Sequence, residues 1–297
     1  MLLNSLTFHI PKTLAEAVEI YSTLENARLQ AGGTFLLNSL KLLKRKGTKT
    51  PEHVITLYKI NELKGIHVDQ DKMVIKAMTT IDDLFEYPSL DNNFKIFRTV
   101  CRNISTQPIR NMATVGGNLT CRYSWTEMPA VMIGLDAQMH FVGRDGKEEV
   151  LPAEKFFEAQ AKTDKIFTHV TIKRDTKAVI SYRRVAKTMG VDIPLLSVIM
   201  KTYFNGDKFS NTVVSVNNCV VFAQRDSILE TFLNGKSPSA TIAKEALDHL
   251  DLKIYDTRGT DYKKDMFRVN ISQAIEELIQ NKKEGIQIKS QYEYSHA

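Results

Sequence analysis

Two glycine pairs interrupt the N-terminal half of the chain: Gly32-Gly33 in "QAGGTFLLNSLK" and Gly116-Gly117 in "RNMATVGGNLT". Small residues come before each pair, a polar residue follows it, and a threonine lies close by. Glycine is unfavourable inside helices and strands, so a pair of glycines needs a specific reason. The chain must either turn tightly at these two points or bring bare backbone close to something.

The two glycine pairs do not match the known phosphate-binding fingerprints. Neither is G-x-G-x-x-G or G-x-x-x-x-G-K-[ST], so a dinucleotide Rossmann site and a P-loop are unsupported. Consecutive backbone N–H groups in such loops can still form a nest for an anion, and glycine lets the backbone approach a pyrophosphate closely. Two ordinary tight turns are the alternative, and the residues alone leave both interpretations open.

Composition and charge limit the protein class. With 297 residues, 43% of them apolar, the chain can form one large domain or two ordinary ones around a real core. It has no run of about 18 apolar residues that could span a membrane, and no signal peptide is recognisable at its start. We therefore expect a cytoplasmic protein. The net charge of +6 comes partly from Lys44-Arg45-Lys46, and such a cluster is favourable at the C-terminus of a helix. The sequence does not show the alternation of basic and aromatic residues that would indicate nucleic-acid binding.

The three cysteines, Cys101, Cys121 and Cys219, are widely spaced. This spacing argues against a disulfide framework and a Cys-x-x-Cys metal site, and three thiolates are too few for an ordinary iron–sulfur cluster. We expect no metal in this chain and an inert thiol at Cys121. His140 and His169 lie on predicted strands without a catalytic partner, so we expect structural roles for them.

Short helices and strands alternate along the whole chain. Helical patterns occur after the capping box at 13–16 and at 35–44, 80–83, 93–104, 126–135, 226–233, 242–250 and 263–280. Strand patterns occur at 28–31, 53–57, 66–68, 73–77, 137–152 (a hairpin), 167–172, 182–186, 195–204 and 213–216. The pattern of strand and helix signals changes after Asp175, which predicts an α+β domain on each side of a boundary near 176. We also expect a flexible tail at 286–297.

Three segments carry a resemblance to a known family. "AGGTFLL", "IRNMATVGGNL" and "EMPAVMIGLDAQM", in this order, resemble the FAD-binding medium subunit of molybdenum hydroxylases, the group of xanthine dehydrogenase and carbon monoxide dehydrogenase. "SYRRVAKTMGVDIPLLSV" is similar to the opening of that family's second domain. The resemblance covers nearly the whole chain. It implies an FAD-binding domain of the vanillyl-alcohol oxidase (PCMH) type at 1–176 and, at 177–285, a smaller α+β domain with a three-stranded sheet.

The resemblance also implies two FAD-binding loops. The first glycine loop (28–35) would wrap the pyrophosphate, and the second glycine loop (113–118) would close on the phosphates and the ribityl chain. The implied residues are Arg28, Leu29, Gln30, Ala31, Gly32, Gly33, Thr34 and Phe35 in the first, and Ala113, Thr114, Val115, Gly116, Gly117 and Asn118 in the second.

Further along the chain, the resemblance places Glu127 where the family usually has Asp near the ribose and the ribityl chain. A carboxylate can accept hydrogen bonds from the hydroxyl groups of both. A helix N-terminal acid is the alternative for this residue. Ile166 and Phe167 match a strand edge that touches the flavin ring.

An aromatic–basic pair opens the second domain. The resemblance assigns Tyr182 and Arg183 to it, and a cation there could stabilise negative charge on reduced flavin. Arg184 is an equal candidate for that cation, and both arginines could instead be surface residues.

Two stretches depart from the family pattern. Phe35 replaces an acidic or small polar residue, and Arg122-Tyr123-Ser124-Trp125 replaces a segment rich in small residues and proline. Trp125 could cover the ribityl region or simply pack on the surface; the sequence leaves both open.

The function implied by the resemblance is an electron relay. Non-covalent FAD would pass electrons from a two-cluster iron–sulfur subunit to a soluble acceptor such as NAD, while a separate subunit carries molybdopterin. No acid or base is needed in this chain for that relay. Two alternatives stay open: a stand-alone FAD-dependent oxidoreductase, and a binding module of the same fold without flavin.

Overall fold

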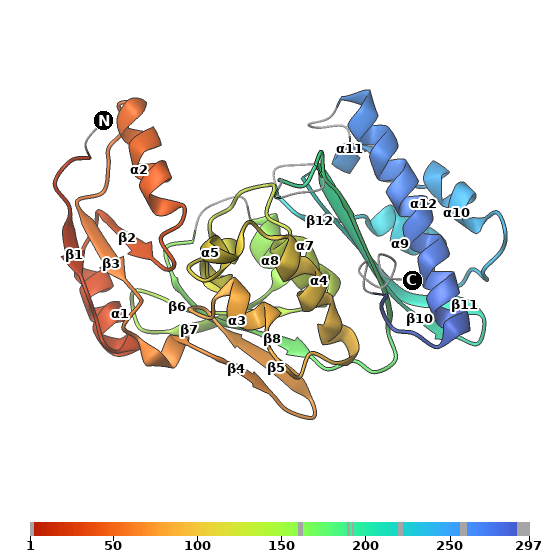
Figure 1. Cartoon of the computed structure of the whole chain (residues 1–297), viewed down its shortest axis with the longest axis horizontal. Coiled ribbons are helices and arrows are strands. Elements are labelled where there is room, and N and C mark those ends of the chain that lie inside the picture. The colour runs from red at the N-terminus through yellow and green to blue at the C-terminus, as the bar shows by residue number, and fades with distance from the viewer. Residues whose placement is uncertain are drawn as a thin grey trace.

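The computed structural model describes residues 3–159, 163–188, 191, 193–218, 222–255 and 260–289. Figure 1 shows three parts in a row: a small sheet with two helices at one end, a five-stranded sheet under several short helices in the middle, and an antiparallel sheet with a long helix at the other end. The architecture is therefore α+β, as the sequence predicts. None of the described helices is long and apolar enough to cross a bilayer.

The first part is a parallel sheet in the order β1-β3-β2. Its elements are β1 (Thr7–His9), α1 (Leu14–Thr23), β2 (Ala27–Gln30), α2 (Leu36–Arg45) and β3 (His53–Thr56). The predicted cap of α1 is present, because Thr13 Oγ1 accepts from Glu16 N at 3.1 Å. The Glu16 carboxylate accepts from Lys12 N instead of Thr13 N, so the box is shifted by one residue.

The middle part is an antiparallel sheet in the order β4-β5-β8-β6-β7 with helices on one face (Figure 1). The strands are β4 (Ile66–Val68), β5 (Lys72–Lys76), β6 (Gln138–Val142), β7 (Glu148–Pro152) and β8 (Ile166–Lys173). The helices are α3 (Ile81–Phe85), α4 (Ile96–Asn103), α5 (Gln107–Arg110), α6 (Val115–Thr120), α7 (Met128–Gly134) and α8 (Ala153–Glu158), with single turns η1 (Asn61–Leu63) and η2 (Asn92–Lys95).

The third part is an antiparallel sheet in the order β12-β11-β10-β9. The strands are β9 (Val179–Val185), β10 (Leu196–Asn205), β11 (Lys208–Asn217) and β12 (Gln224–Arg225). The helices are α9 (Ser227–Leu233), α10 (Ile242–Glu245), η3 (Ala246–Asp248), α11 (Leu252–Tyr255) and α12 (Asp261–Glu284). The resemblance implies a three-stranded sheet, and the structure has a fourth strand because the two-residue β12 pairs with β11 at the edge.

The second and third parts share a packed interface. Helix α7 lies against β10 and β11, and the bare Cα of Gly134 allows this approach, since a Cβ there would lie 2.7 Å from Ile199 Cγ2. Ile180 and Ile199 belong to the same apolar core as α7. The domain boundary near 176 stays a prediction, but the strands that follow it pack directly on the first domain.

The first residues of the predicted tail, 286–289, pack on the fold. Gln287 O accepts from Ile180 N at 2.7 Å, and Ile288 is buried in the core. Residues 286–289 are thus held by backbone pairing and apolar packing, and the rest of the predicted tail, 290–297, lies outside the described residues.

Candidate cofactor-binding site

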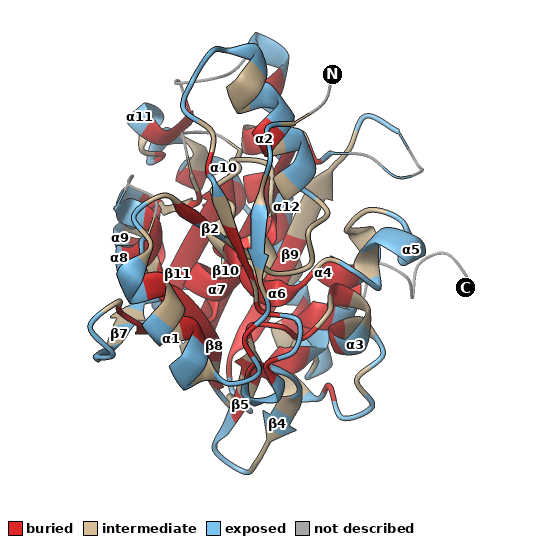
Figure 2. Cartoon of the chain, turned by 90° about the vertical axis from the view of Figure 1, so that its left-hand side faces the viewer, coloured by how far each residue is buried: buried red, intermediate tan, exposed pale blue. Residues whose placement is uncertain are grey.

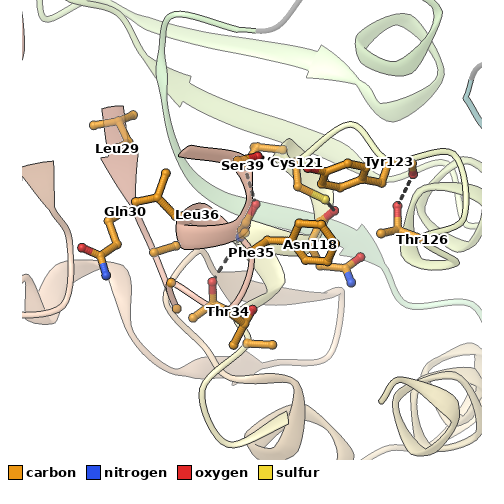
Figure 3. A pocket seen from close by; sticks show the side chains of 18 of the residues that line it. Leu29, Gln30, Thr34, Phe35, Leu36, Ser39, Asn118, Cys121, Tyr123 and Thr126 are labelled. Atoms are coloured by element: carbon orange, nitrogen blue, oxygen red, sulfur yellow. Dashed lines mark hydrogen bonds between the residues drawn. The ribbon is translucent and has the colours of Figure 1, made fainter. Parts of the chain in front are cut away.

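A cavity of about 890 Å³ lies between the first and middle parts of the fold. In Figure 3 the side chains of Gln30, Phe35 and Ser39 come from one wall, and those of Asn118 and Tyr123 come from the opposite wall. Most residues that the resemblance implies line this cavity: Arg28, Leu29, Gln30, Ala31, Gly32, Gly33, Thr34, Phe35, Ala113, Thr114, Gly116, Gly117, Asn118, Glu127 and Phe167. The fold therefore brings together two loops that are about 80 residues apart in the sequence.

The first glycine loop has free backbone donors. Among the described residues, no acceptor lies within hydrogen-bonding distance of the N–H groups of Gly32, Gly33 and Thr34. Gly33 has φ +72°, a conformation that L side chains rarely adopt. The loop leads into α2, whose N-cap residue Phe35 offers no side-chain hydrogen bond. Free N–H groups at the start of a ten-residue helix suit a phosphate group.

Gly32 has a different reason for being bare. A Cβ on Gly32 would lie 1.9 Å from the carbonyl oxygen of Met112, just before the second glycine loop. The sequence suggests that both glycines of this pair are needed because they face a ligand, but for Gly32 this explanation is incomplete. The two loops touch backbone to backbone at Gly32, so glycine is required there by the fold itself.

The second glycine loop is not a nest of free N–H groups. It forms the start of α6: Val115 N donates to Thr79 O and Gly116 N to Ala77 O at 2.9 and 2.8 Å, and Gly117 N donates to Thr114 Oγ1 at 3.1 Å. The nest interpretation is therefore wrong for this loop, because its N–H groups are already used. The helix was not predicted, since two glycines disfavour one; Thr114 caps it.

Packing explains the second pair as well. A Cβ on Gly116 would lie 2.7 Å from the carbonyl oxygen of Ala77, so only glycine lets α6 sit this close to the end of β5. Gly117 has more space, because its nearest neighbours are side-chain atoms of Thr114 at 3.1 Å and Ala31 at 3.6 Å. Figure 2 shows α6 among the buried segments, whereas much of α2 is exposed.

Asn118 supplies an unused acceptor in the cavity wall. Its Oδ1 atom is buried and has no hydrogen-bond partner in the described part of the chain. A buried polar atom without a partner costs about 1–3 kcal/mol unless a ligand satisfies it. This acceptor and the free donors of the first loop fit a ligand that carries both hydroxyl groups and phosphates, as FAD does.

Glu127 lines the cavity and is buried, in a network with Tyr182, which is also buried, and Arg184, which is partly buried. The Tyr182 hydroxyl donates to its carboxylate, and Arg184 Nε lies 3.2 Å from Oε1. Burial raises the pKa of Glu127, and the cation of Arg184 partly opposes that shift. Glu127 also stands at the N-cap of α7 but caps no backbone N–H. Its carboxylate is held mainly by side chains of the third part.

The alternation of β9 separates the two arginines. Tyr182 and Arg184 point to Glu127, whereas Arg183 points to the opposite face, where it donates to Gln273 at 2.5 Å and lies 3.8 Å from Glu277. Arg183 and Tyr182 therefore do not line the cavity. A period of two sends neighbouring residues to opposite faces, and the predicted contact of Arg183 with flavin is contradicted by this geometry.

Two other implied residues also face away from the cavity. Val115 and Ile166 are fully buried in apolar cores, while the neighbouring Phe167 lines the cavity. Strand alternation again accounts for the difference between Ile166 and Phe167.

Several cavity-lining residues were missed or given another role. Only Leu40 of helix α2 is buried, whereas Leu36, Leu42 and Leu43 line the cavity. Its helical period was the available signal. Tyr123, Lys165 and the segment around Ile193 carried no recognisable signal, whereas for Trp125 a position over the ribityl region was one of two open alternatives. The further lining residues are Leu36, Ser39, Leu43, Lys46, Tyr123, Trp125, Lys165, Val191, Ile193 and Pro194.

The remaining thiols and histidines take no part in a metal centre of the described chain, where no group of three ligating side chains occurs. Cys121 is half-buried and its Sγ lies 3.1 Å from Asn118 O. Cys219 lies outside the described residues. His140 and His169 stack at 4.0 Å between ring centroids, and burial lowers the pKa of His169 to about 4.

The comparisons with known proteins agree with this geometry. Residues 4–175 match the family model described as "FAD binding domain in molybdopterin dehydrogenase". The chain is 30% identical over 184 residues to the carbon monoxide dehydrogenase medium chain of Hydrogenophaga pseudoflava, which is 62% of this chain and 60% of that one. It is 35% identical over 147 residues to the medium chain of Afipia carboxidovorans, 49% of this chain and 50% of that one.

These sequence matches span between half and two thirds of the relatives' own length. A solved structure extends the likeness to nearly the whole chain. A chain of the cyanide-inactivated Cu,Mo-carbon monoxide dehydrogenase superposes with a TM-score of 0.81 at 25% identity, covering 94% of this chain and 99% of that one.

Proposed function

Because the chain belongs to the family of FAD-binding domains of molybdopterin dehydrogenases, we propose that it is the electron-transfer subunit of a molybdenum hydroxylase. In this proposal it takes electrons from iron–sulfur clusters in a partner subunit and delivers them to a soluble acceptor such as NAD, in the cytoplasm. A further subunit carries molybdopterin and holds the substrate. The carbon monoxide dehydrogenase medium chains named above are relatives that support this heteromeric arrangement.

One observation carries the proposal: a single cavity joins free backbone donors at Gly32–Thr34 to the unpaired acceptor of Asn118. FAD is the cofactor of this family. When bound, it supplies a group that accepts single electrons and can release two together as a hydride. The chain's own task is to bind and orient the dinucleotide.

The described residues support a relay rather than a stand-alone oxidase. The carboxylate of Glu127 in the cavity wall is already paired, because Tyr182 and Arg184 engage it. An enzyme acting on its own substrate needs a poised acid or base over the flavin. His140 and His169 do not line the cavity.

The isolated chain tests the cofactor assignment. We expect it to purify yellow, to release all of its flavin on acid precipitation and to contain no stoichiometric iron. A colourless chain that FAD does not reconstitute would favour the flavin-free binding module. Flavin left covalently on the precipitate would favour a different class of oxidase.

Co-purification tests the relay. We expect the native complex to contain a molybdenum subunit and an iron–sulfur subunit, and added NADH to bleach the flavin absorbance near 450 nm. Recovery of a flavin-loaded chain alone, turning over a substrate of its own, would contradict the proposal. A complex whose flavin is reduced only through its other subunits, and not by NADH, would reject NAD as the acceptor.

A further inference from the structure

Three aromatic side chains, one from the first glycine loop and two from the segment after α6, meet at the cavity wall. Phe35 lies 4.4 Å from Tyr123 and 6.3 Å from Trp125 between ring centroids, and Tyr123 stacks on Trp125 at 4.5 Å. These distances are typical of attractive aromatic pairs. Phe35 and the segment 122–125 are the two departures from the family pattern, so the two departures are in contact with each other.

These three rings do not belong to a hydrophobic core. None of them is part of the apolar clusters formed by the described residues, and Phe35 is 42% exposed. All three line the cavity. Aromatic surface that is left beside a cavity and outside every core is typical of a binding surface.

Two hydrogen bonds to residues that also line the cavity hold Tyr123 in place. The Tyr123 hydroxyl lies 3.1 Å from Ser39 Oγ on α2, and the carbonyl of Tyr123 accepts from Thr126 Oγ1 at 2.8 Å. A rigid aromatic surface loses little entropy when a flat ligand stacks on it.

Arg122 anchors the segment that carries two of these rings. It has φ +58°, which is uncommon for a residue with a side chain. Its guanidinium donates to the carbonyls of Phe156 and Ala159 and lies 4.3 Å from the Phe156 ring centroid. These contacts hold the backbone turn that directs Tyr123 and Trp125 to the cavity.

We propose that Phe35, Tyr123 and Trp125 form an aromatic wall on which one ring system of bound FAD, its adenine or its isoalloxazine, stacks. The inference rests on FAD being the cofactor of this chain. The wall stands where the family pattern has an acidic or small polar residue at 35 and small residues and proline at 122–125, so ring stacking adds a contact to the dinucleotide that this pattern does not provide.

Substitution of Trp125, the single tryptophan of the chain, tests the wall. We expect Trp125→Leu in the flavin-stripped full chain to weaken FAD binding about three- to tenfold, and Trp125→Phe, which keeps a ring, to weaken it at most about twofold. FMN and ADP, titrated separately, identify the stacked ring, since only one of them should lose affinity. Trp125→Leu that binds FAD as the wild type does, or that loses FMN and ADP equally, would overturn the proposal.

Chemical protection gives a second readout that needs no variant. A tryptophan-selective hydroxynitrobenzyl reagent should modify Trp125 readily in the stripped chain and several-fold more slowly with FAD bound, measured by mass on the peptide that follows Arg122. Wild-type chain that binds FAD but leaves Trp125 equally reactive refutes the wall and leaves the proposed function standing. A chain that binds no FAD at all refutes both.

Discussion

The two glycine loops look alike in sequence and differ in how they use their backbone. In the first loop, the N–H groups of Gly32–Thr34 have no acceptor in the described chain. In the second loop, the N–H groups are already hydrogen-bonded: Val115 N donates to Thr79, Gly116 N to Ala77 and Gly117 N to Thr114. The first is therefore suited to bind phosphates through main-chain donors. The second forms a small capped helix and offers side chains such as Asn118.

The two glycines of each pair also have different surroundings. Gly32 and Gly116 would each place a Cβ against a backbone carbonyl oxygen, at 1.9 and 2.7 Å, so the fold requires them. Gly33 and Gly117 have only side-chain atoms as near neighbours. In one glycine pair, the first glycine can thus be required by packing and the second by ligand binding. The sequence pattern does not show which glycine has which role.

The largest effect is expected from the packing glycines. Gly32→Val and Gly116→Val should each lower the free energy of unfolding by about 3 kcal/mol or more, because a backbone carbonyl cannot rotate away as a side chain can. Urea unfolding measures this. Gly47→Val, where nothing lies within 4 Å of a Cβ but φ is +66°, shows how much stability backbone strain alone removes, and the two packing variants should lose more. A Gly32→Val chain with wild-type stability would mean that the two loops do not touch.

The second largest effect is expected for Gly33→Val, which should leave the protein folded but weaken FAD binding. Forcing a β-branched residue into φ +72° costs about 1–3 kcal/mol, so the loop will leave the conformation that presents its N–H groups and FAD affinity should fall about a hundredfold. Gly47 has φ +66° at the other end of α2 and provides a matched control for the strain alone. Equal FAD affinity in Gly33→Val and Gly47→Val would exclude a role of the first loop in binding.

A smaller loss is expected for Gly117→Val. Valine here would abolish binding if it occupied the space of a phosphate and strained a loop of positive φ, but Gly117 N already donates to Thr114 and its φ is not positive. The new side chain would instead crowd Thr114 and Ala31. We expect FAD affinity to fall about thirtyfold with the protein still folded. Fluorescence titration that finds a loss as large as for Gly33→Val would restore the second loop as a backbone nest.

The sequence predicted the α+β class and most helices and strands. Most of the site residues that the resemblance implies also line the cavity, although they make up less than half of its wall. Its failures have physical causes. Helix α6 was missed because two glycines disfavour a helix, and only the tertiary contact with Ala77 explains them. Arg183 was assigned to the flavin because its position in the chain matches, whereas strand alternation turns it to Gln273. The contact between Phe35 and Trp125 joins loops far apart in the chain, so no local pattern could reveal it.

The smallest effect is expected at Phe35, where three changes oppose one another in Phe35→Asp. Asp would gain the side-chain cap that α2 lacks, worth about 0.5–2 kcal/mol for helix stability. It would lose the ring contacts with Tyr123 and Trp125, about 0.5–1.5 kcal/mol, and would place a negative charge beside the donors meant for phosphate. Because main-chain N–H groups do most of the binding at this loop, the net change in FAD affinity should stay within about tenfold in either direction. Titration of the stripped chain by flavin fluorescence, in low and in high salt, separates the charge from the ring, since only the charge term is screened. If Phe35→Asp shifted affinity a thousandfold while Gly33→Val had little effect, side chains rather than backbone would govern the first loop, and the contrast between the two loops would disappear.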